Sequence, residues 1–387
     1  MDKTEKRKSI LSDTNGQLGP FPTQRLKRVD KATIIITDTI QRIDEREHAL
    51  NRAFRGDYGP AVQKASQRIN IRYPISHALM DVALGLRSLE DNEVASSKAP
   101  IPDDPKVLSR HIKRLGHFLK ADVMGICRLP HYAVYSHDVK GNTINLDYEF
   151  AIVIVAGKDL QTIKASTGSD WITDALSFQC YQRLAFISRT IANYIRRLGY
   201  AALADHTFKR RSGGMKAVYP PLLLQAGIGE ISRAGIVLNP FLGIATKAAA
   251  VFTNLPLEPD KPIDFGLQDF CQHCKICANA CPSKAIPTGD KIMYNGYETW
   301  KLNEQHCASY SLLNKRGTFC GRCVEVCPWT RPYNRPNNVV RWMVEHSRFG
   351  GRFAIKIDSV LNRGKPQEKD KWWFDLEDTG GTLIIPE

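Results

Sequence analysis

Eight of the ten cysteines in this 387-residue chain fall into two groups, and their spacing restricts what the chain can fold into. The first group follows the pattern C-x2-C-x2-C-x3-C-P, which binds iron–sulfur clusters in bacterial proteins. The second group keeps four cysteines, with a longer gap after its first member. The groups are Cys271, Cys274, Cys277 and Cys281, and then Cys307, Cys320, Cys323 and Cys327. This spacing predicts two [4Fe–4S] clusters.

The order of the cysteines also predicts which of them share a cluster. In the bacterial pattern the fourth cysteine binds the neighbouring cluster, so Cys281 and Cys327 exchange partners. One cluster is then held by Cys271, Cys274, Cys277 and Cys327, and the other by Cys281, Cys307, Cys320 and Cys323. Two zinc sites are the alternative, because C-x2-C pairs also bind zinc. A third cysteine two residues on and a fourth before proline favour iron over zinc.

The composition indicates a folded, cytoplasmic protein. Apolar residues make up 43% of the chain and charged residues 24%, a balance that excludes disorder as its general state. No apolar run is long enough for a membrane span, and the charged start, MDKTEKRKSI, lacks an export signal. The net charge of +14 indicates a solvated basic surface, with docking of an acidic ferredoxin as the functional alternative.

Helices and strands follow one another without a regular βαβ rhythm, which predicts an α+β fold. We expect a helix that begins at Pro105, capped by Asp104, and a long amphipathic helix between Ile172 and Leu198. Strands are expected at 123–129, 148–157, 235–238 and 249–253. The predicted regions are a helix-rich N-terminal part (1–100), a core (101–262), a two-cluster domain (263–335) and a C-terminal extension that packs back on the core (336–387).

The two remaining cysteines stand apart from the cluster motifs. Cys127 lies within the first expected strand, and Cys180 lies on the apolar face of the long helix. Free cysteines in such positions behave as small apolar residues. Both are therefore expected to be buried core thiols.

The segment before the clusters is much longer than a small ferredoxin needs, which indicates a second cofactor or a substrate pocket. The chain contains no G-x-G-x-x-G after a strand, no P-loop and no plant-type C-x4-C-x2-C spacing. No nicotinamide module is therefore expected. Electrons are expected from an external low-potential donor, such as a ferredoxin or flavodoxin with its reductase.

Several motifs together resemble those of the cobalamin-dependent reductive dehalogenases. They are AGIGEISRAG (Ala226–Gly235), KAAAVFTNLPL (Lys247–Leu257), FCQHCKICANACPSKAI, WKLNEQHC (Trp300–Cys307) and GRCVEVCPW. The resemblance covers roughly residues 100 to 335. Within that family, the chain is similar to the soluble, catabolic-type branch, without the reductase domain that its members commonly carry.

The resemblance implies a nitroreductase-like α/β core that binds a base-off corrinoid, followed by a bacterial two-[4Fe–4S] ferredoxin-like domain. The clusters would pass electrons to cobalt, which would reduce an organohalide. The catabolic branch implies a halogenated phenol or related aromatic as substrate, and nucleic acid is not an expected partner. The implied corrinoid contacts are Gly227, Gly229, Arg233 and Gly235.

The same resemblance implies the residues that handle the proton. Tyr181, one helix upstream of the L-G-Y element at 198–200, is the implied general acid. Lys247, just before V-F-T, would favour its phenolate, because a free tyrosine has a pKa near 10. Arg316 is the implied arginine of the substrate site. Without the resemblance, Tyr181 would be interpreted as core packing and Lys247 as a solvated lysine.

The chain departs from the respiratory branch of this family at one substrate contact. Respiratory members carry an asparagine before the strand that leads to A-G-x-G-E, and by count Gly214 stands at that position. That contact is therefore expected to be absent. Lysine in place of arginine at position 247 agrees with the catabolic branch.

Two other functions remain open from the sequence. An epoxyqueuosine reductase-like corrinoid enzyme acting on tRNA would explain the basic charge, and C-x-S-Y at Cys307–Tyr310 resembles its sequence. The A-G-x-G-E and V-F-T elements fit the dehalogenases better. A non-catalytic iron–sulfur electron carrier is the third possibility, and it would need no corrinoid.

Overall fold

The computed structural model describes most of the chain between residues 17 and 347 and short stretches beyond it. The described residues are 17–34, 37, 39–69, 73–86, 93–207, 214–314, 319–347, 350–353, 355, 365–367, 377–378 and 383–384. Within these ranges, no helix has the length and apolar character that crossing a membrane requires.

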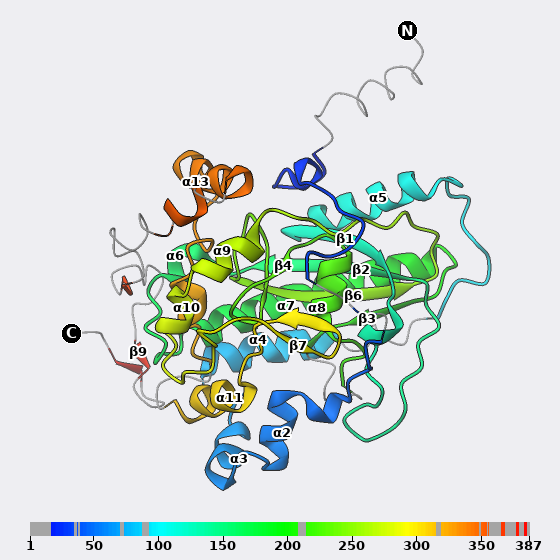
Figure 1. Cartoon of the computed structure of the whole chain (residues 1–387). Helices are drawn as coiled ribbons and strands as arrows, with labels where there is room; N and C mark the ends of the chain where they lie inside the picture. Colours follow the sequence, from blue (N-terminus) through cyan, green and yellow to red (C-terminus); the bar gives the residue numbers. More distant parts are fainter. Residues whose placement is uncertain are drawn as a thin grey trace.

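A four-stranded antiparallel sheet with the order β1-β2-β6-β3 lies at the centre of the molecule (Figure 1). Its strands are β1 (Val123–Arg128), β2 (Phe150–Gly157), β6 (Thr246–Thr253) and β3 (Ala202–Asp205). β2 is buried along almost its whole length, as expected of an apolar, β-branched run in a central strand. It pairs with β1 on one side and β6 on the other, so that Ala156 lies opposite Lys247.

Alternate side chains of β2 point to opposite faces of the sheet, and both sets are apolar. Helices cover both faces and bury these side chains. On one face, Ile152 and Ile154 pack against α5 (Pro105–Phe118) and α7 (Ile172–Arg197). On the other face, Val153 and Val155 pack against α8 (Tyr219–Gln225). A mixed helix-and-sheet core, as the sequence predicts, is therefore confirmed.

Several local predictions are confirmed by these elements. The side chain of Asp104 accepts hydrogen bonds from the backbone of Lys106 and Val107, which caps α5. α7 begins and ends within one residue of the predicted helix. Cys127 and Cys180 are buried core thiols.

The cysteine-rich segment folds from short elements and shares its core with the sheet domain. Its elements are α9 (Leu267–His273), α10 (Ile276–Asn279), β7 (Ile292–Tyr294), β8 (Tyr297–Thr299), α11 (Glu304–Leu313) and α12 (Arg322–Glu325). Phe270 and Trp329 of this segment lie in one apolar cluster with Ile172 and Leu176 of α7. The predicted core (101–262) and the predicted two-cluster domain (263–335) therefore share one apolar core.

The N-terminal helices pack against both of these parts. α4 (Pro74–Gly85) lies on α7, where Met80 and Ala83 meet Phe178. α2 (Ala49–Arg55) and α3 (Pro60–Ser66) lie beside α11 (Figure 1). The remaining elements are η1 (Thr23–Arg25), η2 (Glu45–Glu47), η4 (His131–Ala133), α6 (Leu160–Ile163), β4 (Glu230–Ile231), β5 (Val237–Leu238), α13 (Arg335–His346), β9 (Glu377–Asp378) and β10 (Leu383–Ile384).

Candidate active site and cysteine clusters

The fold brings the eight motif cysteines together in two adjoining sets. The neighbouring thiols that raise the pKa of Cys271 are those of Cys274, Cys327 and Cys277. The neighbouring thiols that raise the pKa of Cys307 are those of Cys320 and Cys281. Cys323 interacts with the second set and also with Cys277, so the two sets are neighbours. These groupings match the exchanged pairing that the spacing predicts, and the role of each cysteine as a ligand stays a prediction.

The burial of these thiols fits iron–sulfur clusters. Burial raises the pKa of Cys271 and Cys323 well above the ordinary value of a thiol, and neighbouring cysteines raise it further. Buried thiolates that neighbour one another need a cationic partner, which iron supplies. Among the described residues, no three potential ligands meet closely enough to hold a single metal ion. A cubane takes its four thiolates on four separate irons, so its ligands stand wider apart.

Arg233 fixes the loop that carries the first cysteines. Its side chain is completely buried, and its guanidinium lies 4.8 Å from the centre of the Trp300 ring. It donates hydrogen bonds of 2.8 to 3.1 Å to the carbonyl oxygens of Cys271, Gln272, Pro287 and Gly289. The arginine of the A-G-x-G-E-I-S-R motif therefore organises the cluster loop, and a direct corrinoid contact stays a prediction.

Two of the predicted corrinoid-binding glycines are explained by close packing of the chain itself. A Cβ at Gly227, where φ is +62°, would lie 2.3 Å from the carbonyl oxygen of Lys261. A Cβ at Gly229 would lie 2.1 Å from the carbonyl oxygen of Leu238. Gly235 is different, since it lines an open cavity of about 200 Å³. Of the three glycines, Gly235 is the one whose surroundings leave room for a ligand.

Tyr181 and Lys247 meet in a larger cavity of about 540 Å³. Tyr181 comes from α7 and Lys247 from β6, and the Lys247 ammonium lies 4.8 Å from the centre of the Tyr181 ring. The same ammonium lies 5.6 Å from the ring of Phe319, the residue before Cys320. The cavity therefore places a phenol and a cation beside the second cysteine set. Lining residues from the N-terminal region include His48, Asn51, Phe54 and Met80.

Two other predicted positions are less informative. Arg316 lies outside the described residues. Gly214, at the position of the respiratory asparagine, lies against the N-terminal segment. A Cβ added at Gly214 would lie 2.0 Å from the Glu45 carboxylate. Glu45 Oε1 also accepts a hydrogen bond of 2.9 Å from the backbone of Met215.

Comparison with known proteins agrees with this arrangement. The family described as "4Fe-4S dicluster domain" matches residues 270–330. A solved catabolic reductive dehalogenase, in complex with 3-bromo-4-hydroxybenzoic acid, is 33% identical and superposes over 95% of this chain with a TM-score of 0.89. The chain belongs to the reductive dehalogenase family. It spans 53% of that solved chain.

Two curated relatives bear on the alternatives. The tetrachloroethene reductive dehalogenase of Sulfurospirillum multivorans is 29% identical over 321 residues, which are 73% of this chain and 62% of the relative. An epoxyqueuosine reductase of Staphylococcus aureus is 33% identical, over 28% of this chain. The dehalogenase likeness thus extends over far more of the chain than the likeness to the tRNA enzyme.

This dehalogenase-family chain has a second tyrosine in the large cavity that the sequence does not single out. The Tyr219 hydroxyl donates a hydrogen bond of 2.9 Å to the carbonyl oxygen of Asp205. Burial raises the pKa of Tyr219 well above its ordinary value, and the Asp205 carboxylate adds to the rise. Tyr219 therefore stays protonated, which makes Tyr181 the better candidate for an acid that must give up its proton.

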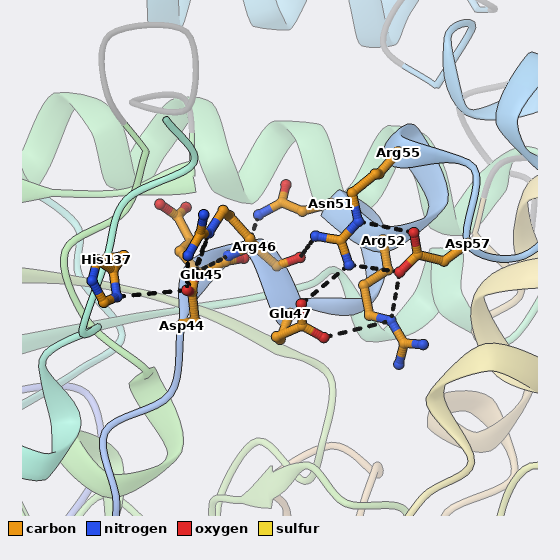
Figure 2. Close-up of polar contacts among 9 residues, drawn as sticks. All are labelled: Asp44, Glu45, Arg46, Glu47, Asn51, Arg52, Arg55, Asp57 and His137. Atoms are coloured by element: carbon orange, nitrogen blue, oxygen red, sulfur yellow. Dashed lines mark hydrogen bonds and ion pairs between the residues drawn. The ribbon is translucent and has the colours of Figure 1, made fainter. Parts of the chain in front are cut away.

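The N-terminal side of the cavity is also missing from the sequence prediction, because no motif marks it. A network of ion pairs fixes this segment (Figure 2). Arg55 pairs with Glu47 at 3.1 Å and with Asp57 at 2.6 Å, while the Asn51 amide donates to the Glu45 carbonyl at 2.6 Å. Each exposed pair contributes little alone, but together they hold the helix that carries Asn51 and Phe54.

A glycine upstream of α7 makes a testable contact with the second cysteine set. Gly168 has a φ of +84°, and a Cβ there would lie 3.0 Å from Arg322 Cβ and 3.2 Å from Cys320 Sγ. We expect Gly168→Ala to lower the free energy of unfolding by roughly 1–3 kcal/mol, because it adds backbone strain and crowds this loop. Denaturant unfolding and iron content measure the effect. The exposed Gly289, whose Cβ would meet nothing within 4 Å, supplies the matched control Gly289→Ala, and equal stability of the two variants would refute the contact.

Proposed function

We propose that this protein catalyses the reductive dehalogenation of an organohalide, using two [4Fe–4S] clusters and a corrinoid. The observation that carries the proposal is the meeting of Tyr181 and Lys247 in a cavity whose wall includes Phe319, next to Cys320. Membership of the family supports it. The replacement of a halogen by hydrogen consumes two electrons and one proton and releases a halide ion.

The residues of the cavity suit the proton part of this reaction. Tyr181 can donate the proton from its hydroxyl to the carbon that loses the halogen. The ammonium of Lys247, at cation–π distance from the ring, stabilises the phenolate left behind. Phe178 meets Tyr181 edge-on, with 6.1 Å between ring centres, and restricts the orientation of the phenol.

The cofactor assignment rests on the two cavities and the cysteine sets. A corrinoid, when bound, supplies the reductive cleavage of the carbon–halogen bond. Gly235, which lines the smaller cavity, and residues that line the larger cavity are our candidates to hold it. The nitroreductase-like core and base-off binding are part of this proposal and rest on the resemblance to the family. An external donor, such as a ferredoxin or flavodoxin with its reductase, would supply electrons through the two clusters that the eight cysteines hold.

A halogenated phenol or related aromatic is the proposed substrate. The large cavity combines aromatic side chains, among them Phe54, Phe178 and Phe319, with the cation of Lys247. Such a lining favours a flat ring that carries a negative charge. The relative solved with 3-bromo-4-hydroxybenzoic acid supports this choice.

Halide release from a substrate panel tests the proposal. Protein loaded anoxically with iron and cobalamin is given reduced viologen with bromophenols, chlorophenols or chlorinated ethenes. We expect halide from the phenols. Halide from the ethenes alone would reject the substrate class, and silence across the panel with cobalamin bound would reject the activity. Binding to tRNA that weakens steeply with salt would then favour the epoxyqueuosine reductase-like alternative.

Lys247 is expected to contribute through its charge. Lys247→Met should lower kcat for halide release by about 10²-fold, because the phenolate of Tyr181 loses its nearby cation. Lys247→Arg keeps the charge and should retain most of the activity. Steady-state kinetics of both variants measure the effect, and a wild-type kcat in Lys247→Met would contradict the proposed role.

A further inference from the structure

Lys158 is a buried lysine whose ammonium has no hydrogen-bond or ion-pair partner among the described residues. It follows directly after β2, its residue is 6% exposed, and its backbone N–H donates to the carbonyl oxygen of Ala245 at 2.8 Å. Within the described part of the chain, no acceptor or carboxylate lies within hydrogen-bonding or ion-pairing distance of its ammonium. A buried cation costs several kcal/mol unless a negative charge compensates it, so the burial of Lys158 requires a negatively charged group nearby.

The titratable groups around Lys158 include one cysteine of the second set. Apart from burial, the groups that shift the pKa of its ammonium are Lys247, Cys180, Cys323 and Asp174. Lys247 repels it, and the buried carboxylate of Asp174, which also accepts a hydrogen bond of 2.5 Å from Ser76, attracts it from beyond ion-pairing distance. Burial and Lys247 together lower the pKa of Lys158 to about 7. The one member of this set that belongs to a predicted cluster is Cys323.

The chain that follows Lys158 runs against the same cysteine set. α6 comes next, and Gly168 then lies close to Cys320 Sγ. The first turn of α7 continues this contact, since the Thr173 hydroxyl donates to the carbonyl oxygen of Cys320 at 3.5 Å. A Cβ at Gly321 would meet that hydroxyl at 2.2 Å. Ala245, which binds the Lys158 backbone, and Leu160, two residues on, pack in one apolar cluster with Cys307 and Cys323. Lys158 therefore lies beside the second set.

We propose that Lys158 is the buried counter-charge of the cluster held by Cys281, Cys307, Cys320 and Cys323, and that it makes this cluster easier to reduce. Four thiolates give such a cluster a net negative charge, and reduction by one electron adds one more. A fixed cation nearby stabilises the reduced form more than the oxidised form. The inference rests on the proposed cluster assignment, but not on the nature of the organohalide.

A redox titration followed by electron paramagnetic resonance tests this role, with dithionite as the reductant. In Lys158→Met, the equilibrium constant for one-electron reduction of one cluster should fall about tenfold, a shift of about 59 mV to more negative potential. The other cluster should keep its potential. Lys158→Arg should keep both potentials near those of the unchanged protein. The exposed Lys106, on α5, supplies the control Lys106→Met, which should shift neither.

Two results would overturn the proposal. Unchanged potentials in a Lys158→Met protein with full iron content would exclude an effect on the cluster. Weakened cobalamin binding with unchanged potentials would assign Lys158 to the corrinoid instead. If the Met variant does not load iron, Lys158→Gln, which keeps polar character, is titrated in its place. The titration needs no organohalide, so it stays decisive even if halide release is not found.

Discussion

Replacing Tyr181 with phenylalanine is expected to lower the rate of halide release by about 10²-fold or more, because the cavity loses its proton donor. Tyr181 lies in the large cavity with the Lys247 ammonium 4.8 Å from its ring. The other tyrosine of this cavity, Tyr219, is held by a hydrogen bond to Asp205 and cannot take over. The measurement is the initial rate of halide release under anoxic conditions.

The control for this variant comes from the same helix. Tyr194 also lies on α7, outside the cavity lining, and its hydroxyl hydrogen-bonds with His111 at 2.8 Å. Tyr194→Phe removes the same hydroxyl group and should leave the rate near that of the unchanged protein. Iron content and cobalamin absorbance should be the same in both variants. A full rate in Tyr181→Phe would remove this tyrosine from the mechanism.

Pairs of cysteine substitutions are expected to show that the two clusters exchange ligands. Cys274→Ala with Cys327→Ala removes two ligands of one cluster, so about four of about eight iron atoms per chain should remain. Cys307→Ala with Cys327→Ala removes one ligand from each cluster, so iron should fall well below four atoms. The grouping of the thiols around Cys271 and Cys307 is the basis for this difference.

The buried thiol of Cys127 provides the control for the cysteine pairs. Cys127 lies in β1, apart from both sets, so Cys127→Ala should keep about eight iron atoms per chain. Iron analysis of anoxic protein measures all variants. The opposite pattern, with four iron atoms kept by the 307/327 pair, would show that each sequence group holds its own cluster.

Much of the fold could be predicted because its signals are local. The apolar run of β2 and the helical spacing along α7 identify a central strand and a long helix without knowledge of their neighbours. The capping of α5 by Asp104 is equally local. The cysteine sets follow from spacing alone, because tight C-x2-C turns bring thiolates to one cluster.

The rest of the site depends on contacts between distant segments, which the sequence does not reveal. The N-terminal wall of the cavity, with His48 and Asn51, contacts the core through side chains that follow no motif. Gly227 and Gly229 resemble ligand-binding glycines, but neighbouring backbone requires them. Lys158 looks like any lysine at the end of a strand, and only tertiary packing makes it buried.

The most direct test of the whole account is the bromide released from a bromophenol by iron-loaded, anoxic protein, with and without cobalamin. We expect bromide only with cobalamin, at two electrons taken from reduced viologen for each bromide ion. Bromide released equally without cobalamin would contradict the account. So would the absence of bromide from protein that holds both clusters and the corrinoid.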